Sequence, residues 1–185
     1  VNSGEQAGRL AGEFIDSAIE ASRSAPVDVM GHSFGGWVAL WLAVQRPERI
    51  DHLVLEAAAG LRPADAPPPP ADPAAFQEAL WRHPENHLLD TRAAGDDAGN
   101  PAMRAQYAVP ATTDERLLAR LDAVRHQTLI LAGTDDRITP KEGHRLLKSR
   151  LESAYLIYVY DAAHGIAVDQ PERTYELIEN FLTRS

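Results

Sequence analysis

Four stretches of the chain carry the apolar spacing of helices: residues 5–22, 34–45, 113–124 and the run that begins at Pro171. In the first stretch, apolar residues form two adjacent rows, Leu10, Phe14 and Ala18 beside Ala11, Ile15 and Ile19. The second is apolar on nearly every side, which predicts a helix covered on most faces and stopped by Pro47. In the last two, we expect these side chains to face inward: Leu117, Leu118, Leu121, Tyr175, Ile178, Phe181 and Leu182.

Short apolar runs lie between these helices, at residues 27–30, 50–55, 128–132 and 154–160. Their length and their bounding turn residues predict buried strands. Strands that alternate with helices indicate the α/β class, with a parallel sheet and helices on both of its faces. After the third run, Thr139, Pro140 and Glu142 have the spacing of a helix start, in which Thr139 is the N-cap and Glu142 completes a capping box.

Residues 61–113 differ in character from the rest of the chain. They include the proline run at 67–70 and two short helix candidates, Pro73–Trp81 and Pro101–Tyr107. We interpret them as a cap inserted over the core. The domain organisation expected is therefore a first core part at 1–60, the cap at 61–113, and a second core part at 114–185.

Composition excludes several classes of function. The 185 residues carry a net charge of −9, which argues against nucleic acid or an anionic membrane as a partner and leaves a small-molecule substrate. The chain has no cysteine, so it has no disulfide and no thiolate metal site, and its histidines lack the spacing of metal ligands. We expect no metal, no cofactor, no membrane-spanning segment and a cytoplasmic location.

The most informative motif is the run Gly31-His32-Ser33-Phe34-Gly35-Gly36, which follows a predicted strand and opens a predicted helix. Gly-x-Ser-x-Gly in this position is the nucleophile elbow, a tight turn that projects a reactive serine. We expect Gly31 and Gly35 to let the strand and the helix approach closely around Ser33. The amides at the start of the helix point toward the same place, where they suit a developing oxyanion.

With this motif, the chain resembles the α/β-hydrolase superfamily, in the branch of cap-bearing esterases and carbon–carbon bond hydrolases. The resemblance implies a triad in the chain order serine, acid, histidine. It places the acid on Asp136, in Gly133-Thr134-Asp135-Asp136-Arg137-Ile138-Thr139-Pro140, and the base on His164, in Asp161-Ala162-Ala163-His164-Gly165. It also implies that the backbone N–H of Phe34 contributes to the oxyanion hole.

Some alternatives stay open at this point. Asp135 and Glu56 compete with Asp136 as the acid, Glu56 because it ends a predicted strand. Asp161 is close to His164 in sequence, but that spacing suits a turn better than a triad. The resemblance also implies that strands and a second oxyanion-hole donor precede residue 1, so we interpret the chain as an N-terminally truncated hydrolase. The function expected is hydrolysis of a small ester, thioester or carbon–carbon bond through an acyl-enzyme; the alternative is a non-catalytic binding module or an inactive fragment.

Overall fold

A computed structural model describes residues 3–22, 26–86 and 111–184, and it contains one sheet of four parallel strands. The strands are β1 (Val27–His32), β2 (Ile50–Glu56), β3 (Gln127–Gly133) and β4 (Ala154–Val159). They lie in the order β1-β2-β3-β4, so each strand pairs with the next one in sequence. The predicted α/β class and parallel sheet are confirmed.

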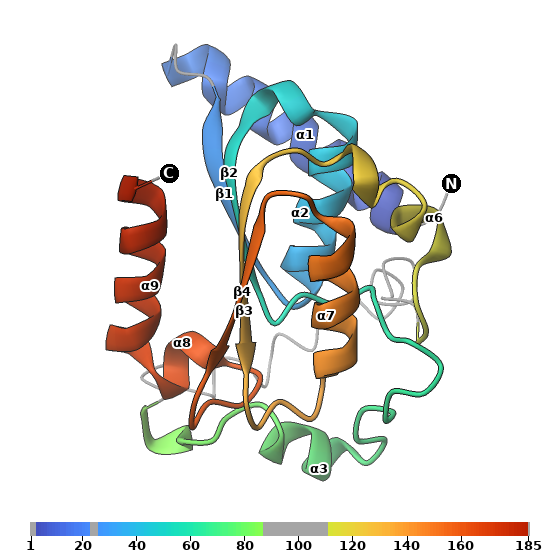
Figure 1. Cartoon of the computed structure of the whole chain (residues 1–185), viewed down its shortest axis with the longest axis vertical. Helices are drawn as coiled ribbons and strands as arrows, with labels where there is room; N and C mark the ends of the chain where they lie inside the picture. The colour runs from blue at the N-terminus through green and yellow to red at the C-terminus, as the bar shows by residue number, and fades with distance from the viewer. Residues whose placement is uncertain (1–2, 23–25, 87–110, 185) are drawn as a thin grey trace.

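Helices cover both faces of this sheet (Figure 1). On one face lie α1 (Ser3–Ser22), α2 (Phe34–Gln45) and α7 (Lys141–Arg150); on the other lie α8 (Ile166–Asp169) and α9 (Pro171–Arg184). Because successive strand residues point to opposite faces, Leu53 and Leu55 pack toward α2, whereas Val54 packs toward α9. The predicted helix at 34–45 is confirmed to the residue, and seven of its twelve residues are buried.

The packing of α1 differs from the pattern of its apolar residues. A Cβ atom added to Gly4 would lie 2.3 Å from the Trp37 ring, and one added to Gly8 would lie 2.7 Å from the Trp41 Cβ, so these glycines set the close approach to α2. Leu10 and Phe14, by contrast, are 44% and 74% exposed. No helix among the described residues is both long enough and apolar enough to cross a bilayer.

Three further expectations need correction. The run 27–30 is not a buried strand, because β1 is at the edge of the described sheet and Met30 is 50% exposed. Residues 113–124 form the short helix α6 (Glu115–Leu118) and a separate 3₁₀ turn at Leu121–Ala123, although Leu117 and Leu121 are buried as expected. Tyr175 lies on the exposed side of α9, where its hydroxyl donates to Glu179.

Of the predicted cap, the structure describes residues 61–86 and 111–113. They include α3 (Pro73–Glu78) and a 3₁₀ turn at Pro84–Asn86, whereas the helix candidate at 101–107 lies outside the described residues. Asp72 caps α3, because its carboxylate accepts a hydrogen bond from the Ala75 amide. This segment lies at the end of the sheet toward which the strands point (Figure 1).

Candidate active site

The three residues predicted to carry the chemistry follow three different strands. Ser33 comes directly after β1, Asp136 lies in the loop after β3, and His164 lies in the loop after β4. Because the strands are parallel, these loops meet at the carboxyl ends of the strands, where ligands bind in open α/β folds. The helix α3 lies at the same end of the sheet (Figure 1).

The turn at Ser33 is strained, as a nucleophile elbow requires. Ser33 has φ 51° and ψ −115°, a backbone conformation that a residue with a side chain rarely adopts. A Cβ atom on Gly31 would lie 2.4 Å from the Gly35 carbonyl oxygen, and one on Gly36 would lie 2.7 Å from the Ala58 Cβ. Nothing lies within 4 Å of the corresponding position on Gly35, so the close approach depends on Gly31 and Gly36 rather than on Gly35.

The side chains of Ser33, His164 and Asp136 form one hydrogen-bonded chain. The Nε2 atom of His164 lies 2.8 Å from the Ser33 Oγ, and its Nδ1 atom lies 3.1 Å from the Asp136 Oδ2. The His164 and Asp136 side chains are 3% and 2% exposed. Because an ionised carboxylate only accepts hydrogen bonds, Nδ1 carries the proton and Nε2 is free to accept one from the serine hydroxyl.

Asp136 is held as a carboxylate by its neighbours. Burial alone would raise the pKa of Asp136, but the hydrogen bond and charge of His164, together with hydrogen bonds from Thr139, outweigh it and hold that pKa below its ordinary value. Oδ1 accepts from the amides of Ile138 and Thr139 at 2.7 and 2.9 Å, and Oδ2 accepts from the Thr139 hydroxyl at 2.5 Å. The prediction that Thr139 caps α7 is therefore wrong, because its hydroxyl is bonded to Asp136 and the helix starts after Pro140.

The competing carboxylates lie in other interactions. Asp135 is exposed and pairs with the Arg82 guanidinium at 3.4 Å. Glu56 is buried at the end of β2, and its Oε1 accepts a hydrogen bond from the Ala167 amide at 2.7 Å. Asp161 bonds to His83 and Arg82. Among the described residues, the carboxylate that contacts the His164 imidazole is that of Asp136.

The first turn of α2 lies next to Ser33 and supplies backbone donors. Phe34 is the first residue of this helix, so its N–H is one of the four that have no acceptor inside the helix. A cavity of about 250 Å³ adjoins the nucleophile. The residues that line it are mainly apolar: Ser33, Ala59, Gly60, Leu61, Arg62, Pro69, Phe76, Ala111, Ile138, Thr139 and Pro140.

Sequence reasoning assigned no role to His32, yet it contacts the loop of the base. Its Nε2–H donates to the backbone carbonyl of His164 at 3.0 Å, and the two imidazole rings lie 4.9 Å apart between centroids. Its place in the elbow, directly before Ser33, is the only sequence signal that could have indicated this contact. His32 therefore ties the elbow to the loop after β4.

His144, on α7, is a buried histidine whose two ring nitrogens have no hydrogen-bond partner among the described residues. Burial lowers the pKa of His144 from 6.5 to about 4. Between these values the unfolded chain binds more protons than the folded one, so stability is fully present above pH 6.5 and falls as the pH drops toward 4. The free energy of unfolding should therefore decrease by about 2 kcal/mol from pH 7 to pH 5 on account of this residue.

Urea unfolding at the two pH values tests this expectation. The variant His144→Leu places an apolar side chain in the buried site. The difference in its free energy of unfolding between pH 7 and pH 5 should be about 2 kcal/mol smaller than in the wild type. The variant should be no less stable than the wild type at pH 7, because no described hydrogen bond is lost. An unchanged difference between pH 7 and pH 5 in this variant would show that another group causes the acid sensitivity.

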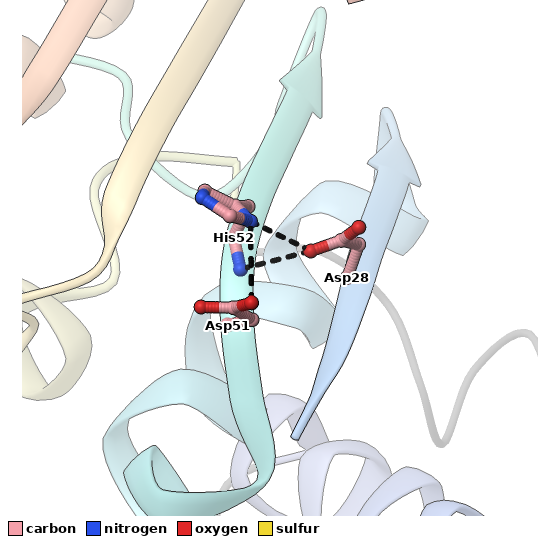
Figure 2. A group of neighbouring side chains, drawn as sticks. All are labelled: Asp28, Asp51 and His52. Atoms are coloured by element: carbon pink, nitrogen blue, oxygen red, sulfur yellow. Dashed lines mark hydrogen bonds and ion pairs between the residues drawn. The ribbon is translucent and has the colours of Figure 1, made fainter. Parts of the chain in front are cut away.

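A second group of polar side chains lies at the opposite ends of the strands. These are Asp28 on β1 and Asp51 and His52 on β2. Each offers one atom that could bind a metal ion, and the three atoms lie within 4.8 Å of one another (Figure 2). The Nδ1–H of His52 donates to Asp28 at 2.8 Å and lies 3.7 Å from Asp51. Both carboxylates are exposed, and this hydrogen bond accounts for the grouping without an ion. The group is separate from Ser33 and does not contribute to the candidate active site.

Comparison with known proteins gives a consistent result. The model of the alpha/beta hydrolase family matches residues 5–177. A 2-hydroxy-6-oxo-2,4-heptadienoate hydrolase from Pseudomonas putida is 30% identical over 187 residues, which cover 91% of this chain and 66% of that protein. A pimeloyl-[acyl-carrier protein] methyl ester esterase from Neisseria meningitidis is 29% identical over 192 residues, which cover 92% of this chain and 61% of that protein. The chain thus spans less than two thirds of the length of these relatives.

Solved structures support the same fold. The meta-cleavage product hydrolase from Pseudomonas fluorescens IP01 superposes with a TM-score of 0.72 at 18% identity, over 96% of this chain and 72% of that one. At this identity the likeness concerns the fold alone.

Proposed function

The chain belongs to the alpha/beta hydrolase family, and we propose that it is a serine hydrolase that forms an acyl-enzyme on Ser33. The observation that carries the proposal is the imidazole of His164, which bonds to Ser33 on one side and to Asp136 on the other. A serine hydroxyl is a weak nucleophile at its free pKa and needs a base, and the base needs an orienting acid. The three side chains have the geometry for these roles.

The proposed reaction has two halves. Ser33 Oγ attacks the carbonyl carbon of the substrate while His164 Nε2 takes the hydroxyl proton, and the resulting oxyanion accepts a hydrogen bond from the Phe34 amide. The bond to the leaving group then breaks, and His164 gives its proton to that group. In the second half, water attacks the acyl-enzyme while His164 takes a proton from it, and His164 returns this proton to Ser33 Oγ as the acyl–oxygen bond breaks and the acid leaves. Asp136 stays ionised and stabilises the imidazolium throughout.

The substrate class is a small ester, thioester or carbon–carbon bond next to a carbonyl. Support comes from the relatives, which are named as a hydrolase of a dienoate and as a methyl ester esterase. The apolar cavity of about 250 Å³ beside Ser33 suits a small acyl group. We propose that residues 61–113 act as the cap of this cavity, since Leu61, Arg62 and Phe76 line it.

Labelling with a fluorophosphonate tests the nucleophile directly. The reagent phosphonylates an activated serine, so we expect one adduct, which intact mass would count and peptide mapping would place on Ser33. The adduct should be absent from Ser33→Ala, which removes the hydroxyl. It should form much more slowly in His164→Ala, which removes the base bonded to that hydroxyl.

Ser149→Ala is the matched control, because Ser149 is an exposed serine on α7 whose hydroxyl donates to the Leu146 carbonyl. This variant should label as fast as the wild type. An adduct on another serine, or no adduct on a chain that circular dichroism shows to be folded, would contradict the proposal.

A further inference from the structure

The loop that carries His164 is held by a part of the protein that the proposed reaction does not use. The amide of Gly165, directly after the base, donates to the Leu80 carbonyl at 2.7 Å. A Cβ atom on Gly165 would lie 2.7 Å from the Trp81 ring, so the histidine loop is in direct contact with residues 80–83, which we call the cap segment. Residues 80–83, which follow α3, therefore pack against the backbone of the histidine loop.

Asp169 lies at the centre of this contact. It ends α8 and is 3% exposed. Its Oδ1 accepts from the amides of Arg82 and His83 at 2.8 and 2.7 Å. Its Oδ2 accepts from the Ala163 amide, directly before the base, at 2.7 Å. The Arg82 amide is shared between the two oxygens, because it also donates to Oδ2 at 3.0 Å. One buried carboxylate thus joins the cap segment to the histidine loop.

Charged side chains at the surface support the same junction. Asp161, three residues before His164, accepts a hydrogen bond from His83 at 2.8 Å and from Arg82 at 3.2 Å. Arg82 also lies 3.4 Å from Asp135, in the loop of the acid. The Arg82 pairs are exposed and the His83–Asp161 pair is only partly buried, so each contributes little and the buried Asp169 is the stronger connection.

We propose that Asp169 is a positioning residue that couples residues 80–83 to the loop of His164, so that the imidazole stays aligned with Ser33 only while the cap segment is docked. The proposal rests on the assignment of His164 as the general base. The amides on both sides of His164 are fixed by this junction, through Asp169 at Ala163 and through Leu80 at Gly165. Displacement of a catalytic group by about 1 Å can cost about 10²-fold in rate.

The variant Asp169→Asn tests the coupling through kinetics. An amide has one acceptor oxygen in place of two, so either the His83 amide of the cap segment or the Ala163 amide of the histidine loop loses its acceptor and faces an NH₂ group. We expect kcat to fall about 10- to 100-fold while KM changes less than about threefold, because alignment rather than substrate binding is affected. Asp169→Glu keeps the carboxylate and should recover part of kcat. Glu172→Gln removes an exposed carboxylate from α9 and should leave both constants unchanged.

Hydrogen exchange tests the coupling without reference to activity. In the wild type, the amides of Arg82, His83, Ala163 and Gly165 should open together and show similar protection. In Asp169→Asn, exchange at all four should rise at least about tenfold, while the β3 amides keep their protection.

The outcomes separate the two proposals. Wild-type kcat in a folded Asp169→Asn overturns the positioning role. If neither Asp169→Asn nor Asp169→Glu folds, hydrogen exchange in the wild type decides. Rapid exchange at the Arg82 and His83 amides, with the Ala163 amide still protected, overturns the coupling. Similar protection at all of these amides supports it. If the wild type shows neither turnover nor labelling, the proposed function fails, whereas the exchange result still decides whether the two segments are coupled.

Discussion

Replacing Asp136 by asparagine should lower kcat about 10⁴-fold, equivalent to about 5.5 kcal/mol of activation free energy, with little loss of stability. The asparagine oxygen can still accept from the amides of Ile138 and Thr139, so the loop keeps its shape. Its NH₂ group then faces the Nδ1 atom of His164 and donates to it. The proton of the imidazole moves to Nε2, which can no longer accept the proton of Ser33.

Two variants make this experiment decisive about the identity of the acid. Asp135→Asn changes the neighbouring, exposed carboxylate and should leave kcat within about twofold of the wild type. Glu56→Gln retains an oxygen for the Ala167 amide and should reduce kcat far less than Asp136→Asn does. Steady-state kinetics on an activated ester give all three values. A large loss in Glu56→Gln beside a nearly active Asp136→Asn would assign the acid to Glu56.

The sequence was most informative where burial dictates residue type. The helix at 34–45 and the strand at Ile50–Glu56 are apolar over most of their length, so their positions and their place in the core could be predicted. The order Ser33, Asp136, His164 was implied by the resemblance to the α/β-hydrolase superfamily rather than by the apolar pattern, and in the structure each of the three follows a strand. What the sequence could not settle was which of three acidic side chains reaches His164, because that depends on the loop after β3.

The errors have physical causes that no apolar pattern contains. Apolar spacing predicted the helix α1 but not its packed side, since Leu10 and Phe14 are exposed and the two tryptophans of α2 leave room only for glycine at the contact. Thr139 has the sequence of an N-cap, yet α7 begins at Lys141 with Pro140 as its N-cap, and the Thr139 hydroxyl donates to the buried carboxylate of Asp136. The contact of His32 with the His164 carbonyl joins residues 132 positions apart, so the place of His32 in the elbow could not by itself identify the partner.

Replacing Asp114 by alanine should lower the free energy of unfolding by about 4 kcal/mol, a large part of the total for a domain of this size. Asp114 is buried, and its Oδ2 accepts from the indole N–H groups of Trp37 and Trp41, each at 3.0 Å. Both tryptophans are fully buried on α2, so without the carboxylate their N–H donors have no water to turn to. Urea unfolding at constant m-value measures the loss.

Asp72→Ala is the matched control, because Asp72 caps α3 as Asp114 caps α6. Asp114 accepts from the Leu117 amide at 3.2 Å, and Asp72, which is exposed, accepts from the Ala75 amide at 2.9 Å. The loss of a cap alone costs about 1 kcal/mol, so the excess in Asp114→Ala measures the two indole hydrogen bonds. Equal losses in the two variants would mean that the indoles contribute nothing.

The Asp114 amide also donates to the Gly60 carbonyl at 2.8 Å, which brings together the two ends of residues 61–113. The carboxylate separately ties Asp114 to the helix that follows Ser33, through the two indoles. Asp114→Ala should therefore break the connection to α2 and leave the backbone hydrogen bond to Gly60 in place.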